Sequence, residues 1–379
     1  MRSRGPKLAE GVALLLLGIL LFRFPEASAA AAQEGVRLCL DLLVPSLFPF
    51  FVFSSLVIVT GLADAVSRPF QTLMLPLFGV GGPGAAALGL GLIGGYPVGA
   101  RTIAQLVDSH ACSREEACRL SRFCNNCGPA FFLGAAGVGI FGSKEAGILL
   151  MGANLAAALL MGVLTRITEG PLLPSSVGNI SSPRSSLAAA LPDCVRDSFS
   201  STLGVCAYVI LFSVLTALAD ASGLLPLCVD ALTDLFPGEH TEALGRSLFA
   251  GFLELSTGTA ALADGKTAPL ALPLAAFLLG WGGLSVHCQS LPFWRSAGVP
   301  AGPYLRAKAL QGLLSAGFTA LFLRVHPLAL PAMASSLPLS AAVPFRRELL
   351  LLWSLAGLSF FLSPKKGMEK TGKQRYNTK

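Results

Sequence analysis

The sequence predicts an all-α polytopic membrane protein, built from two related repeats with broken or re-entrant helices. Hydrophobic residues make up 53% of the 379-residue chain and charged residues only 13%, well under the roughly 25% of a soluble domain. The mean hydropathy is +0.67, and apolar runs of about the length of a membrane span recur along the chain. Glycine, proline and polar residues interrupt several runs at corresponding places in the two halves, and this pattern predicts the repeats.

The net charge of +7 is concentrated at one end of the chain. The tail after Ser363 carries +5 of it, directly behind an apolar segment. Basic residues beside a span are typical of the cytoplasmic side and of contact with anionic lipid headgroups. Together with Arg2, Arg4 and Lys7, the tail predicts an even number of spans with both termini cytoplasmic. Membrane lipid is therefore the expected partner of this charge, and no nucleic acid is expected.

The first apolar run, 8–22, has two interpretations. The following Pro25-Glu-Ala-Ser-Ala29 resembles the cleavage site of a signal peptide. The run is longer than usual for a signal peptide, however, and more membrane segments follow. We therefore favour a retained first membrane helix.

Further apolar segments alternate with polar connections. Ser113 and Glu116 form a capping box, which predicts a surface helix within a cytoplasmic loop at 101–122. A second basic loop is expected to hold Arg295, Arg306 and Lys308. The segments that we expect in the membrane are 36–60 (interrupted by Pro45 and Pro49), 70–80, 89–100, 130–141, 145–164, 199–218, 247–263, 269–284, 309–323 and 349–362.

Prolines, serines and mixed charges make 166–198 the clearest linker, and it divides the chain into halves. The connection at 101–122 is charged whereas its counterpart at 261–284 is mostly apolar, which favours opposite orientations of the two halves. The predicted parts are an N-terminal membrane helix (1–35), a first repeat (36–165), the linker (166–198), a second repeat (199–325), a C-terminal membrane helix (326–363) and a basic cytoplasmic tail (364–379).

Four interruptions are the candidate site, namely 89–100, 124–129, 254–258 and 285–290. Thirty residues separate Gly94 from Cys124, and thirty also separate Glu254 from Leu284. A helix broken in hydrocarbon leaves backbone groups unpaired, which is tolerated only inside protein or beside a water-filled cavity. A single break could be a mere kink, but paired breaks predict a transporter's substrate site. We expect the four to converge near mid-membrane.

The side chains at these breaks offer binding chemistry. Glu254 lies seven residues into an apolar run, where a carboxylate marks a pathway more often than a helix end reaching a headgroup. Asn125 and Asn126 supply amide donors and acceptors, although asparagine also caps ordinary helix ends. The predicted substrate-binding residues are Gly94, Gly95, Tyr96, Asn125, Asn126, Glu254, Ser256, Thr257, Ser285, His287 and Gln289.

Other chemistry receives less support. His287 could be a structural histidine, and Tyr96 could anchor an interface instead of stacking on a planar ligand. Cys124 and Cys127 could form a redox or metal pair, but zinc needs four ligands and only His287 with Cys288 would complete a set. No P-loop, Gly-x-Ser-x-Gly elbow or metalloprotease motif is present, so neither an enzyme nor an ATP-driven pump is predicted. We expect no cofactor and no metal, with H+ or Na+ as a candidate coupling ion at Glu254. The oligomeric state, including a homo-oligomer, stays open.

Several of these segments carry a resemblance to a known family. Phe24-Pro25-Glu26, Pro45-Ser-Leu-Phe-Pro49, Gly94-Gly-Tyr-Pro-Val-Gly-Ala100, Phe123-Cys-Asn-Asn126 with Gly128-Pro129, and Gly283-Leu-Ser-Val-His287 resemble the YlbJ-like sporulation integral membrane proteins. That family carries the nucleoside-recognition Gate domain and is similar to concentrative nucleoside transporters and to the gate region of ferrous-iron transporters. Cys127 departs from its pattern, where a small hydroxyl residue or glycine is expected.

The resemblance implies a role in endospore formation, with transport of dipicolinate across the outer forespore membrane and dependence of spore cortex formation on it. Helices that restart at Pro97 and Pro129 would direct N–H groups at such an anion. A nucleoside-type transporter and a non-transporting scaffold for spore envelope assembly are the alternatives. A thiol oxidoreductase that uses Cys124 and Cys127 is a third.

Overall fold

The computed structural model describes residues 5–62, 72–129, 131–170, 172, 186–263 and 268–328, which all lie in one compact unit (Met1–Ser336). Within them, every regular element is helical. The helices are α1 (Gly5–Arg23), α2 (Pro25–Leu38), α3 (Val44–Val59), α5 (Gly84–Gly94), α6 (Val98–Asp108), α7 (Arg114–Ser121), α8 (Lys144–Glu169), α9 (Leu187–Ala221), α10 (Leu224–Leu235), α11 (Thr241–Leu253), α12 (Leu255–Ala260), α13 (Ala271–Trp281), α14 (Gly283–Ala297) and α15 (Ala301–Val325). Two π-helical segments, η1 (Cys39–Leu43) and η2 (Phe131–Ile140), and a 3-10 turn, η3 (Ala261–Ala263), complete the set.

The lengths and composition of the helices confirm the predicted class, a polytopic α-helical membrane protein. In the described part of the chain, three helical stretches are long and apolar enough to cross a bilayer: α8, α9 and α13 with α14. A fourth joins α1 to α2 across a bend of 96° at Phe24. The predicted N-terminal membrane helix is therefore two helices, and the proline at the first turn of α2 begins the second one.

Two predicted boundaries are wrong. Residues 187–198 belong to α9, not to the linker, and Ser186 caps the start of that 35-residue helix. Pro192 is the sixth residue of α9, so the helix continues through it with one backbone hydrogen bond missing. The segment 36–60 is not interrupted at Pro45 and Pro49 either, because α2, η1 and α3 follow each other without a gap. The π-helical segment η1 accommodates the irregular hydrogen bonding before Pro45.

The loop predicted at 101–122 is also partly wrong. Arg101 lies on α6, is buried, and donates to the hydroxyl of Ser198 on α9 over 3.2 Å. Its guanidinium also lies 4.9 Å from the centre of the Phe51 ring. An apolar helix can contain a buried arginine when another helix supplies polar and aromatic contacts. The helix after Ser113 is confirmed, as α7 begins with the predicted capping box. The prediction that it lies on the surface is wrong, because five of its eight residues are buried.

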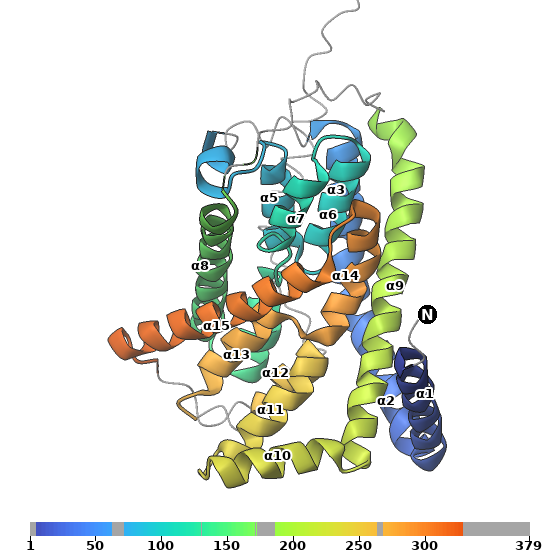
Figure 1. The fold of residues 1–379 in the computed structure, drawn as a ribbon, viewed down its shortest axis with the longest axis vertical. Helices are drawn as coiled ribbons and strands as arrows, with labels where there is room; N and C mark the ends of the chain where they lie inside the picture. Colours follow the sequence, from blue (N-terminus) through green and yellow to red (C-terminus); the bar gives the residue numbers. More distant parts are fainter. Residues whose placement is uncertain are drawn as a thin grey trace, which may run out of the picture. The chain divides into compact units, whose positions relative to one another are not determined.

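The helices pack in two groups around separate apolar cores. One core joins α6 and α7 to α14 and α15, and the other joins η2 and α8 to α13. In Figure 1, α15 crosses α8 and α13, and both contacts are extensive. The long α9 runs beside α2 and α3. As a result, α15, which comes late in the sequence, packs on helices from both halves.

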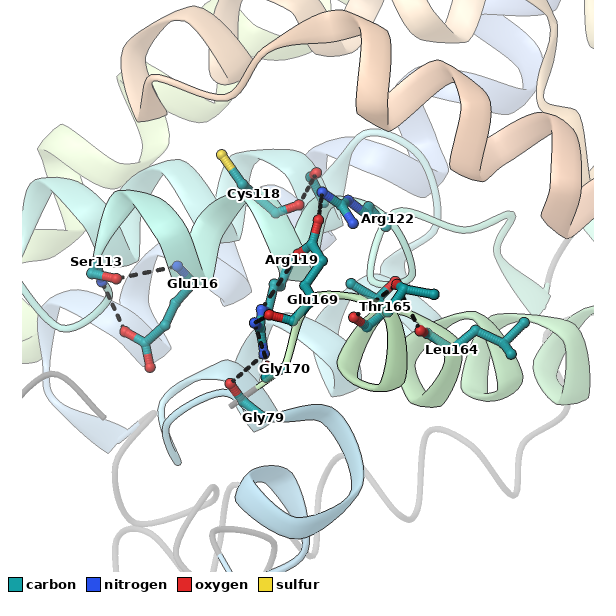
Figure 2. Close-up of polar contacts among 12 residues, drawn as sticks. Gly79, Ser113, Glu116, Cys118, Arg119, Arg122, Leu164, Thr165, Glu169 and Gly170 are labelled. Atoms are coloured by element: carbon teal, nitrogen blue, oxygen red, sulfur yellow. Dashed lines mark hydrogen bonds and ion pairs between the residues drawn. The ribbon is translucent and has the colours of Figure 1, made fainter. Parts of the chain in front are cut away.

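Arg119 on α7 ties this helix to the end of α8 (Figure 2). Its guanidinium donates to the carbonyl oxygens of Gly79 at 3.3 Å and Gly170 at 2.6 Å, and it pairs with Glu169 at 3.5 Å. Burial lowers the pKa of this guanidinium, while the Glu169 carboxylate opposes the shift. Glu116 accepts a hydrogen bond from the Gly81 backbone at 2.7 Å. These contacts fix α7 directly before the break at 124–129.

The predicted repeat relationship and its inversion stay predictions. The C-terminal membrane helix within 326–363 and the basic tail 364–379 lie outside the described residues, apart from 326–328. The orientation of both termini also stays a prediction.

Candidate functional site

The first two predicted breaks lie against each other. The chain leaves helical geometry at Gly95 and resumes at Val98, and it does so again between Ser121 and Phe131. Gly91 and Gly99 face the carbonyl of Cys124 so closely that neither position has room for a Cβ atom. A Cβ at Gly95 would come 2.8 Å from the Gly128 backbone nitrogen. The glycines therefore allow two broken helices to make backbone contact, as small residues do in membrane interfaces.

Tyr96 connects this pair to the second half of the chain. Its hydroxyl donates to the carbonyl oxygen of Leu279, in the last turns of α13, at 3.0 Å. Its ring lies against Gly282, where α13 ends and α14 begins with a left-handed residue at φ 92°. The ring is thus buried between the first break and the junction of α13 and α14.

The structure confirms a break at Glu254, which separates α11 from α12. The side chain is 2% exposed and caps α12, accepting from the Thr257 backbone N–H at 2.7 Å and from its hydroxyl at 2.9 Å. This break packs on the junction of α13 and α14, because Gly283 faces the Leu255 nitrogen and the Leu253 carbonyl. Glu254 is therefore directed into protein.

The fourth break is displaced from its predicted place. Residues 285–290 are helical in α14, and the interruption is at Gly282 and Gly283, which both have positive φ. Polar side chains made 285–290 look irregular in the sequence, but they occupy the buried face of a helix. All four breaks are nevertheless joined by contacts. The break at 124–128 contacts the one at 95–97, and Tyr96 contacts the junction at 282–283, which in turn packs on the break at Glu254.

Asn125 links the second break to α14 and α15. Its amide nitrogen donates to the hydroxyls of Ser290 at 3.1 Å and Tyr304 at 3.2 Å, and its oxygen accepts from the Ala100 backbone at 3.4 Å. Tyr304 also bonds His287 Nδ1 at 3.0 Å. All four side chains are buried, so the predicted residues Asn125 and His287 share one hydrogen-bond network.

The centre of this network is a lysine that the sequence analysis placed in a loop. Lys308 lies two turns inside α15 and is fully buried. Its ammonium donates to the Asn125 carbonyl at 2.9 Å and to Gln311 Oε1 at 2.7 Å, and lies 5.2 Å from the centre of the Tyr96 ring. Gln311 in turn donates to Asn126 Oδ1 at 2.7 Å. We call Asn125, Asn126, His287, Tyr304, Lys308 and Gln311 the buried polar network.

Two polar atoms beside this network lack a hydrogen-bond partner among the described residues: Asn154 Nδ2 on α8 and His287 Nε2 on α14. Asn154 Oδ1 accepts from Gln311 at 3.4 Å. A buried polar group without a partner costs about 1–3 kcal/mol. Such groups call for a water molecule or a ligand.

Other predicted site residues lie outside the network. Thr257 is exposed and Ser256 is half-buried, and both lie on α12, which contributes no residue to the buried polar network. Ser285 and Gln289 are buried and bond each other at 3.0 Å along α14. Of the predicted glycines, Gly95 is buried in the backbone contact described above, and Gly94 is half-buried. The structure therefore unites Tyr96, Asn125, Asn126 and His287, and it adds residues that the sequence analysis did not select.

The residues that were missed had a signal in the sequence. Asn154 is a polar residue within the apolar run 145–164, and such residues are functional candidates by default. Lys308 and Gln311 have the i, i+3 spacing of neighbours on a helix. Lysine near a membrane boundary is usually a topology signal, so the sequence pattern predicts an outward direction for this side chain and not the inward one that it has.

Cys124 and Cys127 are free and buried. If the thiols carry no redox chemistry, the double variant Cys124→Ser, Cys127→Ser should keep full function, because serine preserves side-chain size. The measurement is solute accumulation by vesicles that contain the variant, with wild-type protein as control. Loss of accumulation in a variant that is folded and inserted would support the oxidoreductase alternative.

Comparisons with known proteins give one informative relative. The chain is 30% identical over 331 residues to the sporulation integral membrane protein YlbJ of Bacillus subtilis (strain 168), with 81% of this chain and 80% of that protein covered. No protein-family model matches the sequence. No solved structure matches it either.

Proposed function

The chain belongs to the family of YlbJ-like sporulation integral membrane proteins, and from this premise we propose that it transports or facilitates the passage of a small planar anion, dipicolinate, during endospore formation. The proposed location is the outer forespore membrane, and spore cortex formation would depend on the solute delivered there.

The observation that carries the proposal is the meeting of four helix breaks beside the buried polar network. Breaks leave backbone groups unpaired in the membrane, at several kcal/mol each, unless protein or a water-filled space surrounds them. Gathering them at one place is energetically reasonable where a polar solute must pass. Transporters of several folds place their substrate sites at such discontinuous helices.

The chemistry of the network supports a flat anion. Dipicolinate is a pyridine ring with two carboxylates, and carboxylates accept hydrogen bonds from amide and ammonium donors. Asn154 Nδ2 and His287 Nε2 are buried nitrogens without a partner among the described residues, and Lys308 supplies a buried cation. The Tyr96 ring offers an aromatic face. Glu254, buried at the neighbouring break, would carry the coupling ion, H+ or Na+.

Vesicles that contain the purified full chain test the proposal directly. We expect uptake of radiolabelled dipicolinate above that of protein-free vesicles, with uridine and adenosine taken up poorly. Uptake of nucleosides instead would favour the nucleoside-type alternative. Absence of uptake for every solute, with and without proton and sodium gradients, would contradict transport and favour a scaffold.

A further inference from the structure

We infer that Lys308 is the residue that selects anionic solutes, and that a bound anion takes its ammonium over from the backbone of the break at 124–128. This inference rests on the proposed function and adds to it a named residue that recognises the charge of the solute.

The surroundings of Lys308 are neutral. Its side chain is fully buried on α15, and the ion pairs found among the described residues do not include it. Its hydrogen-bond acceptors are a backbone carbonyl and a side-chain amide. A buried ammonium without a counter-charge is energetically costly, so burial by itself favours the neutral amine. A carboxylate that reaches it would remove that cost, which gives a site selective for anions.

The same contacts are replaceable. A carboxylate carries a full negative charge, whereas the Asn125 carbonyl and Gln311 Oε1 are neutral dipoles. In a low-dielectric interior the ammonium is attracted more strongly to the full charge, so an entering carboxylate would compete with these two acceptors. The Tyr96 ring, whose centre lies 5.2 Å from the ammonium, makes a cation–π contact with it and no hydrogen bond.

Transfer of the ammonium to a solute would change the hydrogen bonds of the break itself. Lys308 bonds the Asn125 carbonyl, and Gln311, which it also bonds, holds the side chain of Asn126. These two bonds connect α15 to consecutive residues of the second break. When the ammonium turns to the solute, the Asn125 carbonyl and Gln311 Oε1 each lose this donor. The bonds from Asn125 to Tyr304 and from Gln311 to Asn126 still hold α15 to the break.

Three variants of the full chain in detergent test the inference. Lys308→Gln removes the charge. Gln311→Glu places a carboxylate where Oε1 now lies 2.7 Å from the ammonium, so that Lys308 forms an ion pair within the protein and is no longer available to the solute. Lys144→Gln, the same substitution at an exposed residue of α8, is the control. Equilibrium binding of dipicolinate and of its neutral analogue pyridine-2,6-dicarboxamide is measured by calorimetry, with thermal unfolding of each variant in parallel.

We expect Lys308→Gln and Gln311→Glu to weaken dipicolinate binding about tenfold to hundredfold, as loss of a charged hydrogen bond would, and to leave binding of the neutral analogue within about twofold. Lys144→Gln should bind like wild type. If Lys308→Gln does not fold, Lys308→Met replaces it, since apolar substitution of a buried charge is often tolerated.

The inference is overturned if a folded Lys308 variant binds dipicolinate as wild type does, or if both ligands weaken equally. Those outcomes leave transport by the wild-type protein intact. Failure of the proposed function would instead appear as absence of dipicolinate binding and uptake in the wild type itself.

Discussion

Gly91→Ala should prevent the protein from folding. A methyl group on Gly91 would overlap the Cys124 carbonyl oxygen and would also lie 3.1 Å from the Gly99 Cα atom. Both are backbone atoms, so no side-chain rotation can relieve the overlap. Overpacking of a core typically costs about 1–3 kcal/mol. We expect a larger cost here, because the added methyl group would force the backbones of the two broken helices apart. We expect little or no monodisperse protein after membrane extraction.

The matched control lies on the same helix. Gly89 has no atom within 4 Å of where a Cβ would be placed, so Gly89→Ala should leave the yield and the melting temperature unchanged or slightly raised, since alanine favours helices by about 1 kcal/mol over glycine. Fluorescence-detected size exclusion and thermal unfolding in detergent compare the two variants. Equal behaviour of Gly91→Ala and wild type would show that the first and second breaks are not in backbone contact.

Glu254→Gln should abolish gradient-driven accumulation of the solute and leave the fold intact. Glutamine keeps an oxygen that can accept from the Thr257 backbone and hydroxyl, so the cap of α12 survives. It cannot bind a proton or sodium as a carboxylate does. We therefore expect accumulation against a gradient to fall to the passive level, by about tenfold or more.

Glu242→Gln is the control for this experiment, because Glu242 is exposed in the first turn of α11. Uptake into vesicles with and without proton and sodium gradients is compared, and melting temperatures of both variants are recorded. If Glu254→Gln accumulates solute as wild type does, the carboxylate serves only as a helix cap and ion coupling at this residue is wrong.

The sequence was sufficient to locate most of the breaks. Helix α5 ends at Gly94, Gly95 follows with φ 77°, and Pro97 directly precedes α6, so the glycine and proline that interrupt the apolar run lie at the helix break. Glu254 was recognisable for a similar reason, as a carboxylate within an apolar run must lie at an irregularity or face protein. At 285–290 the same reasoning was wrong, because polar residues spaced along one helix face do not break the helix when that face is buried.

What the sequence by itself determined is the class of the protein and the residues that cannot continue a membrane helix, since composition, glycine and proline act locally. Which side chains meet at the breaks was decided only by the tertiary structure. Lys308 resembles any lysine beside a membrane segment, and its role in the network depends on α15 packing across α8 and α13, with Asn125 from a segment 183 residues away as its acceptor. A long polar side chain turns inward or outward according to the partners that other helices provide, and those partners are not encoded in its neighbours along the chain.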